Sequence, residues 1–386
     1  FIDSDQEFCI NSTTSDDHYY AINYFHYLDH IFRNKSIEVL TGKVVGDPPV
    51  SPSVMAGNFQ QDIQAFLTTI AKLSPEDSCA FHHTQNQDSD EGAAYHDMAN
   101  LFGFTGQPHT YNYHCTLEHE HTNSYCFQDF SKKLEQFFYG EHPTRKTFFN
   151  YDNGFSTTAE ARTVYTGNYV IKPSALSHFI PFATLKLRMA GPVLGRLLKN
   201  KISGQFVSAN LPMLHKRTIE KTRQSEFRSG VKQNDDNVDL NNEFVRQFYG
   251  DIMLFSIEKI TATGYPDVEI FKKDIQAIVN QTYKDIKDIY IKKHDTILQL
   301  KSDIDLQLHN EKQWWNNTSI HSEELSIALR NFDAFLNNIE SNFSESSDAY
   351  LKITTEVEVN ANINTIVSAI HHLTDDYKNW NSLVST

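Results

Sequence analysis

The chain has 386 residues, of which 39% are hydrophobic, and its formal net charge is −15. This length predicts two domains, and the hydrophobic content is sufficient for a buried core. No apolar run approaches the ~20 residues that span a membrane. The acidic charge excludes nucleic acid as the main partner, because phosphate backbones select basic surfaces.

The first 240 residues predict short elements joined by loops, because prolines and glycines recur throughout them. Apolar spacing predicts helices over 15–32 and 57–73, and 165–171 has the composition of a short strand. The polar run 229–242 is the best candidate for a linker.

Residues 81–121 concentrate groups that bind cations. Seven of the 18 histidines of the chain lie in this segment, and nine carboxylates but no basic residue lie between Lys72 and Lys132. Such a segment is electrostatically unfavourable unless a cation enters it. Neutral imidazoles and carboxylate oxygens together are typical ligands of transition metals. The segment therefore predicts a bound metal, with zinc as the expected ion.

The spacing of residues along the sequence indicates which side chains bind this metal. His119 and His121 are two residues apart, so on a strand both side chains would face the same side. His82 and His83 are adjacent, so at most one of them can point into the site. The remaining candidates fit one loop that enters a helix. The predicted metal ligands are His82, Asp90, His96, Asp97, His119 and His121, with Glu91 or Asp88 as a general base outside the ligand shell.

The four cysteines lie in the first third of the chain and form no C-x-x-C pair, which argues against a thiolate zinc ribbon. An even number confined to one region predicts two disulfides, and hence an oxidising, extracellular compartment. Cys9–Cys79 and Cys115–Cys126 are the favoured pairs among three connectivities. Four buried free thiols in a cytosolic protein are the alternative.

Residues 184–232 form a basic segment, with eleven lysines and arginines against two glutamates. Apolar and basic residues alternate in its first half, which is typical of peripheral contact with an anionic membrane or with phosphate groups. A solvated helical face paired with acidic surface elsewhere is the alternative. Pro192 and the glycines beside it exclude one continuous amphipathic helix. The predicted substrate or membrane contacts are Lys186, Arg188 and Arg196.

The last 120 residues, 267–386, contain neither proline nor glycine and predict a bundle of long helices. Ser322 is the expected N-cap of the second of these helices. Helices are predicted over 267–308, 321–343 and 360–380, with turns near 313–320 and 344–360. The predicted fold class is mainly α, with an irregular helix-and-loop metal-binding domain over 1–235 followed by a long-helix bundle over 243–386.

The segments FHHTQNQDSDEGAAYHD and HCTLEHEH, in a mostly helical chain, resemble the secreted zinc-dependent phospholipases C of bacteria and fungi. This resemblance implies a secreted enzyme with a zinc centre of histidines and carboxylates that acts on phospholipid head groups.

Two functional hypotheses follow. The first is a metal-dependent phosphoester hydrolase, expected to be a phospholipase C, in which zinc lowers the pKa of a bound water to about 7 and Glu91 or Asp88 takes its proton. No H-E-x-x-H, G-x-S-x-G, P-loop or G-x-G-x-x-G motif occurs, which disfavours zinc peptidases, serine esterases, kinases and dehydrogenases. The second is a non-enzymatic secreted helical protein, such as a toxin, adhesin or receptor-binding module, whose carboxyl-terminal helices make the interaction.

Overall fold

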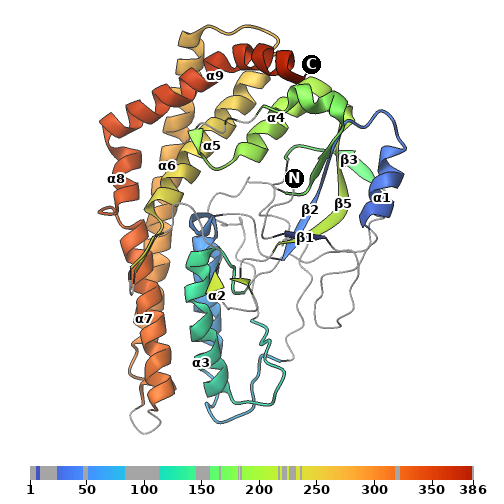
Figure 1. Ribbon diagram of the computed structural model, residues 1–386. Helices are drawn as coiled ribbons and strands as arrows, with labels where there is room; N and C mark the ends of the chain where they lie inside the picture. Colours follow the sequence, from blue (N-terminus) through green and yellow to red (C-terminus); the bar gives the residue numbers. More distant parts are fainter. Residues whose placement is uncertain are drawn as a thin grey trace.

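Helices dominate the computed structural model of the chain, and a small mixed sheet lies to one side of them (Figure 1). This arrangement confirms the mainly α fold class. None of the described helices is both long and apolar enough to cross a membrane. The structure describes residues 6–8, 24–46, 51–82, 113–144, 157–164, 167–180, 182, 185–215, 218–219, 224–225, 232–234, 237–317 and 322–384.

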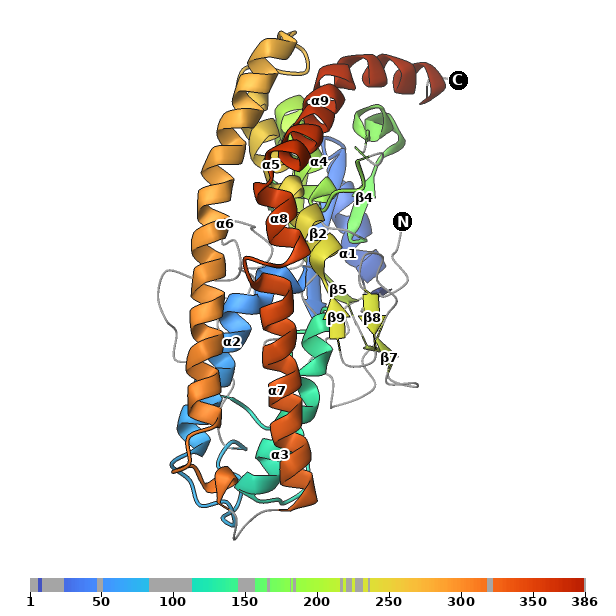
Figure 2. The same cartoon turned by 90° about the vertical axis from the view of Figure 1, so that its left-hand side faces the viewer.

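The carboxyl-terminal helices form an elongated bundle. The 37-residue α6 spans most of its length, α7 packs beside one half of α6, and α9 packs against the other half (Figure 2). The described residues after 267 contain no strand, so the predicted helical bundle is confirmed. The helices are α5 Asn241–Thr261, α6 Lys272–Leu308, α7 Glu323–Phe343, α8 Asp348–Thr354 and α9 Glu356–Val384.

Serine N-caps begin two of these helices. Ser322 accepts a hydrogen bond from the Leu325 backbone N–H at 3.2 Å, as the sequence predicted for α7. Ser347 caps α8 in the same way through the Tyr350 N–H, also at 3.2 Å. Helix α8 lies within 344–360, where only a turn was predicted, because a seven-residue helix is too short to give a clear apolar period.

Two helices from the first half of the chain pack against this bundle. Helix α2, Pro52–Ile70, lies along α6, and α3, Asn123–Lys133, lies along α7 (Figures 1 and 2). Trp314, in the turn after α6, donates to the last carbonyl of α2 at 3.0 Å. Trp315 stacks on Phe127 of α3, with ring centroids 5.1 Å apart. The turn after α6 thereby holds the ends of α2 and α3.

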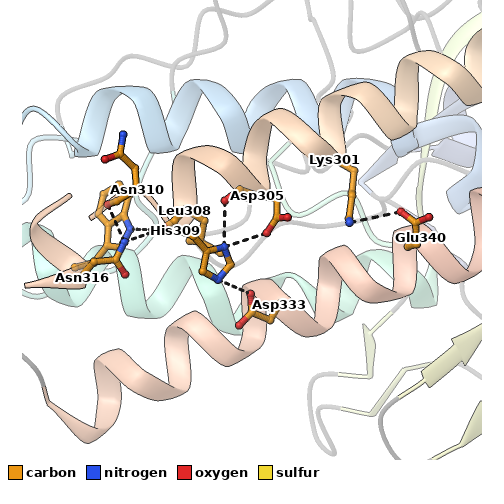
Figure 3. Close-up of polar contacts among 9 residues, drawn as sticks. Lys301, Asp305, Leu308, His309, Asn310, Asn316, Asp333 and Glu340 are labelled. Atoms are coloured by element: carbon orange, nitrogen blue, oxygen red, sulfur yellow. Dashed lines mark hydrogen bonds and ion pairs between the residues drawn. The ribbon is translucent and has the colours of Figure 1, made fainter. Parts of the chain in front are cut away.

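Polar contacts join α6 and α7 near the same end of the bundle (Figure 3). His309, directly after α6, lies between two carboxylates, with Nδ1 3.0 Å from Asp305 and Nε2 3.3 Å from Asp333. Lys301 lies 3.5 Å from Glu340 further along the two helices. Each contact is partly exposed and contributes little stability alone, but together they align the end of α6 with α7.

The mixed sheet is built around β5. On one side of β5 lies β2, which runs parallel to it, and β4 pairs antiparallel with β2. On the other side of β5, β3 pairs antiparallel with its first half and β1 pairs antiparallel with its last residues. The short strand expected within 165–171 is present as β4. The strands are β1 Gln6–Phe8, β2 Val39–Gly46, β3 Thr158–Glu160, β4 Tyr169–Ile171 and β5 Phe206–His215. Two short hairpins follow, β6 Thr218–Ile219 with β7 Gln224–Ser225, and β8 Lys232–Asn234 with β9 Asn237–Asp239.

One helix covers each face of this sheet. Helix α1, Tyr24–Phe32, buries Tyr24 and Ile31 against β2 and β5, and α4, Ala190–Ile202, buries Leu194 and Leu198 on the opposite face. The basic segment is not one continuous helix, as expected. Pro192 lies in the first turn of α4, where no intrahelical N–H bond is lost.

Buried side chains from both predicted domains belong to one hydrophobic cluster. The cluster includes Phe59, Phe137, Phe248, Ile297 and Ile370. The predicted linker contains β9, and the Val238 N–H there donates to Asn338 of α7 at 2.7 Å. The division into domains 1–235 and 243–386 stays a prediction, and a continuous core joins its two parts.

Candidate metal centre

Two loop segments, 71–82 and 113–122, meet beyond the carboxyl end of α2 and lead into α3. Backbone hydrogen bonds join them: the Cys79 N–H donates to the His121 carbonyl at 2.9 Å, and the Cys115 N–H donates to the Phe81 carbonyl at 3.2 Å. These bonds place Cys79, Cys115 and His121 on neighbouring stretches of backbone.

The first turn of α3 adds a further set of contacts. The side chain of Thr122 caps the helix by accepting from the Tyr125 N–H. The buried Asn123 amide accepts from the Ala80 N–H at 3.1 Å and donates to the Ser74 carbonyl at 2.9 Å. The amino end of α3, which carries Cys126, is therefore fixed to the loop that carries Cys79.

Aromatic packing anchors both loops to the helices. Phe81 and Tyr113, one from each loop, pack on Phe66 of α2 with ring centroids 5.2 and 5.0 Å apart. Phe66 also stacks on Phe130 of α3 at 4.1 Å. Burial of these rings supplies the apolar floor beneath the polar groups of the loops.

The four side chains that this scaffold brings together form a Cys/His cluster. One ligand atom from each of Cys79, Cys115, His121 and Cys126 lies within 4.8 Å of all the others. The three cysteines are buried and His121 is half-buried. Among the residues that the structure describes, this is the one group with metal-binding geometry.

The orientation of His121 suits metal binding. Its Nδ1 lies 2.7 Å from the His119 carbonyl, which accepts a hydrogen bond and so favours the tautomer with hydrogen on Nδ1. The other nitrogen, Nε2, then carries the free lone pair. Nε2 faces the cluster, 3.3 Å from the Cys115 sulfur.

The thiols titrate unequally because they share hydrogen bonds. The bond that Cys126 donates, helped by the Leu117 N–H and His121, outweighs burial and lowers the pKa of Cys115 to about 5. Donating that bond, together with burial, raises the pKa of Cys126, and burial also raises the pKa of Cys79. Without a cation the cluster favours one thiolate, on Cys115, and a divalent cation would favour ionisation of the other two.

The donor set fits zinc. Three sulfurs and one imidazole nitrogen form the Cys₃His combination of structural zinc sites, which are four-coordinate and tetrahedral. Soft thiolate ligands select zinc over magnesium or calcium, which prefer oxygen. With four protein ligands such a site has no open position for water or substrate.

The cysteine assignments made from the sequence require correction. Cys79, Cys115 and Cys126 are free thiols, so the expected disulfides Cys9–Cys79 and Cys115–Cys126 are absent, and Cys9 itself lies outside the described residues. The sequence argument considered thiolate ligands only as C-x-x-C pairs of a zinc ribbon, whereas cysteines separated in sequence converge here through loop pairing. Extracellular localisation stays a prediction without its disulfide support.

Two further predicted metal ligands lie in the described residues, and both are outside the Cys/His cluster. His82 is next to it, with Nε2 3.3 Å from Nδ1 of His121. His119 is exposed and contributes its backbone carbonyl instead of its ring. The other nominated ligands and general bases, Asp88, Asp90, Glu91, His96 and Asp97, lie outside the described residues.

Two of the three predicted contacts of the basic segment, Arg188 and Arg196, have intramolecular partners. Arg188 lies 3.3 Å from Glu243 of α5. Arg196 is buried, donates to the Arg162 carbonyl at 2.8 Å and lies 3.5 Å from Glu258. Lys186 is exposed. Contact of these residues with phospholipid or another phosphoester stays a prediction.

Sequence reasoning pointed to the region that contains the cluster and selected His121, but it missed the three cysteines of the cluster as candidate ligands. The available signal was C-x₅-H-x₄-C over 115–126, in which thiols and an imidazole lie within one short segment. No protein-family model, curated protein or solved structure matches the chain.

Proposed function

We propose that the chain is a zinc-stabilised helical binding protein, in which one zinc ion held by Cys79, Cys115, His121 and Cys126 has a structural role. The observation that carries this proposal is the complete set of four ligand atoms, all within 4.8 Å of one another. Of the two hypotheses drawn from the sequence, this proposal takes the non-enzymatic one.

A closed ligand set supports a structural role over a catalytic one. Catalytic zinc sites keep three protein ligands and leave the fourth position for water or substrate. Here a fourth protein ligand fills that position, so the zinc would not generate the hydroxide that phosphoester hydrolysis requires. Hydrolysis by this chain would need a second centre, and its nominated base, Glu91 or Asp88, lies outside the described residues.

The zinc would hold together parts of the fold that have little secondary structure of their own. The loops 71–82 and 113–122 are joined by a small number of hydrogen bonds and two aromatic anchors. Four metal–ligand bonds would cross-link both loops to α3. Since α3 packs along α7 and α2 along α6, the ion would fix the end of the helical bundle.

Zinc content measured on matched histidine variants tests this proposal. His121→Ala removes a ligand, so we expect zinc to fall from one ion per chain to near zero after dialysis against a competing chelator. His119→Ala, two residues away and exposed, removes a ring that is not a ligand and should keep one zinc per chain.

Zinc loss in both variants, or in neither, would contradict the assignment. Hydrolysis of phosphatidylcholine by the zinc-loaded protein, abolished by His121→Ala while the fold is retained, would favour the phospholipase hypothesis instead.

A further inference from the structure

We propose that the Cys/His cluster is also a site of reversible oxidation, at which a hydroperoxide converts Cys115 and Cys126 to a disulfide and releases the zinc. This inference rests on the proposed zinc site and concerns its regulation. The observation behind it is that the cluster contains three free cysteines. If the metal leaves, any two of them can form a disulfide.

Any two of the three sulfurs could form a disulfide, and the Cys126 thiol on α3 lies close to both of the others. All three sulfurs lie within 4.8 Å of one another, so a bond of ~2.05 Å needs only a small local movement. The question is which partner can make that movement.

Backbone restraint favours Cys115 as the partner. Cys79 is held by its N–H bond to the His121 carbonyl, and the next residue, Ala80, donates to the Asn123 side chain. Cys115 is held by fewer bonds, with one longer N–H bond to the Phe81 carbonyl at 3.2 Å, and it lies in 113–118, which forms neither helix nor strand. Cys126 is fixed in the first turns of α3 by its N–H bond to the Thr122 carbonyl at 3.0 Å. The expected movement is therefore that of Cys115 towards Cys126.

The chemistry needs one hydroperoxide and two protons. The Cys115 thiolate attacks an oxygen of the hydroperoxide, the O–O bond breaks, and Cys115 becomes a sulfenic acid. Hydrogen peroxide releases hydroxide, which is protonated to water, and an organic hydroperoxide releases an alkoxide, which is protonated to the alcohol. The Cys126 thiolate then attacks the sulfenic sulfur, forming the S–S bond and displacing hydroxide, which is also protonated. The two sulfurs lose two electrons and the peroxide gains them. Zinc keeps only Cys79 and His121 as ligands and dissociates.

Access and consequence both follow from where the cluster lies. His121 is only half-buried, and the adjacent residues 118–120 are exposed, so a small oxidant approaches from that side. Loss of zinc would leave the segment between Cys115 and Cys126 closed by its own disulfide but no longer cross-linked to the loop of Cys79. Oxidation would thus loosen the end of the bundle while the helices persist.

Titration of zinc-loaded protein with hydrogen peroxide tests the inference. Released zinc is followed with a chromogenic indicator, and disulfides are mapped by non-reducing peptide mass spectrometry. We expect one zinc released per Cys115–Cys126 disulfide, with recovery of the bound zinc after addition of dithiothreitol and zinc. The Cys9→Ser variant, which removes the one cysteine of the sequence other than Cys79, Cys115 and Cys126, should behave identically.

The outcomes separate this inference from the proposal on which it rests. Purified protein without zinc contradicts the structural zinc site, and the inference fails with it. Zinc-loaded protein that keeps its metal under peroxide, or that links Cys79 to Cys115 or to Cys126, overturns the inference alone. A Cys115→Ser variant that still forms an intrachain disulfide at the same rate would also overturn it.

Discussion

Asp251 is the most unusual ionisable residue in the helical core. It is fully buried on α5, where Oδ1 accepts from Gln247 at 3.0 Å and Oδ2 accepts from the Tyr290 hydroxyl of α6. Burial raises the pKa of Asp251 to about 7, and the two hydrogen bonds offset only part of this effect. The carboxyl is therefore mostly protonated in the folded protein at mildly acidic pH.

This raised pKa makes stability depend on pH. The unfolded chain releases the Asp251 proton near pH ~4, whereas the folded chain keeps it until about pH 7. Between these values the folded state binds more protons, so the free energy of unfolding falls as pH rises. A difference of this size between the folded and unfolded pKa corresponds to ~4 kcal/mol, an upper bound for one buried carboxyl.

Asp251→Asn should remove this dependence, because the amide keeps the shape and cannot ionise. We expect the free energy of unfolding of the variant, measured in urea, to fall less steeply between pH 5 and 8 than that of the unsubstituted protein. At pH 8 the variant should be the more stable of the two. Asp375→Asn, which removes an equal charge at an exposed position of α9, is the control. Identical pH profiles for the Asp251→Asn and unsubstituted proteins would show that Asp251 does not titrate in this range.

Residue identity alone did not separate ligands from their neighbours. His119 and His121 have equal claim to a metal by spacing, and the two differ only because the backbone turns one ring inward and leaves the other exposed. The cysteines were assigned to disulfides because thiols offer the same sequence signal for both roles. Only the pairing of the loops decides between them.

At the scale of elements, the packing of α4 requires its backbone to lie very close to the backbone of Arg162 and Thr163. A Cβ added at Gly195 would lie 2.5 Å from the Arg162 carbonyl oxygen and 2.7 Å from the Thr163 Cα, both backbone atoms. Glycine is unfavourable within a helix by ~1 kcal/mol relative to alanine. Its presence in α4 is explained by this contact, which brings the helix against segment 157–164 beside the sheet.

Gly195→Ala therefore has two opposite effects on stability, a gain from helix propensity and a loss from packing. Propensity alone would stabilise the protein, but we expect a net loss of ~1–3 kcal/mol because the clash is with backbone that cannot rotate away. Gly204, where an added Cβ would meet no neighbouring atom within 4 Å, provides the control substitution Gly204→Ala. Urea unfolding checks both variants, and a Gly195→Ala protein as stable as the parent would refute the close-contact argument.

The elements differ in how far sequence could predict them. Long helices such as α6, α7 and α9 were predicted because many residues repeat one apolar period. The metal-binding loops were not, because their conformation is set by contacts such as Asn123 with Ala80 and Ser74, which no local pattern encodes. Strand β4 was found within its expected range, while its pairing with β2 was not predictable.

At the scale of the whole molecule, the continuous core suggests that folding couples the two predicted domains. Residues from α2, α3, α5, α6, α7 and α9 share one buried cluster, and the candidate zinc site lies at the end where α2 and α3 join α6 and α7. Zinc held at the proposed site would bind the folded chain more tightly than the unfolded one and so would stabilise it by mass action.

Calorimetry of zinc-loaded and metal-free protein tests this coupling. We expect a single cooperative transition with zinc, and a fall in Tm on chelation of roughly 1 °C for each kcal/mol lost by a chain of 386 residues. Far-ultraviolet circular dichroism at low temperature should change little, because the helices have their own packing. Two well-separated transitions in the zinc-loaded protein would instead support independent domains at 1–235 and 243–386.

X-ray absorption at the zinc edge of the purified protein tests the central claim most directly, because it counts the atoms bound to the metal. A closed Cys₃His site predicts one zinc per chain with three sulfurs at ~2.3 Å and one nitrogen at ~2.0 Å. A shell of nitrogen and oxygen without sulfur, as expected for a centre of histidines and carboxylates with bound water, would contradict the account.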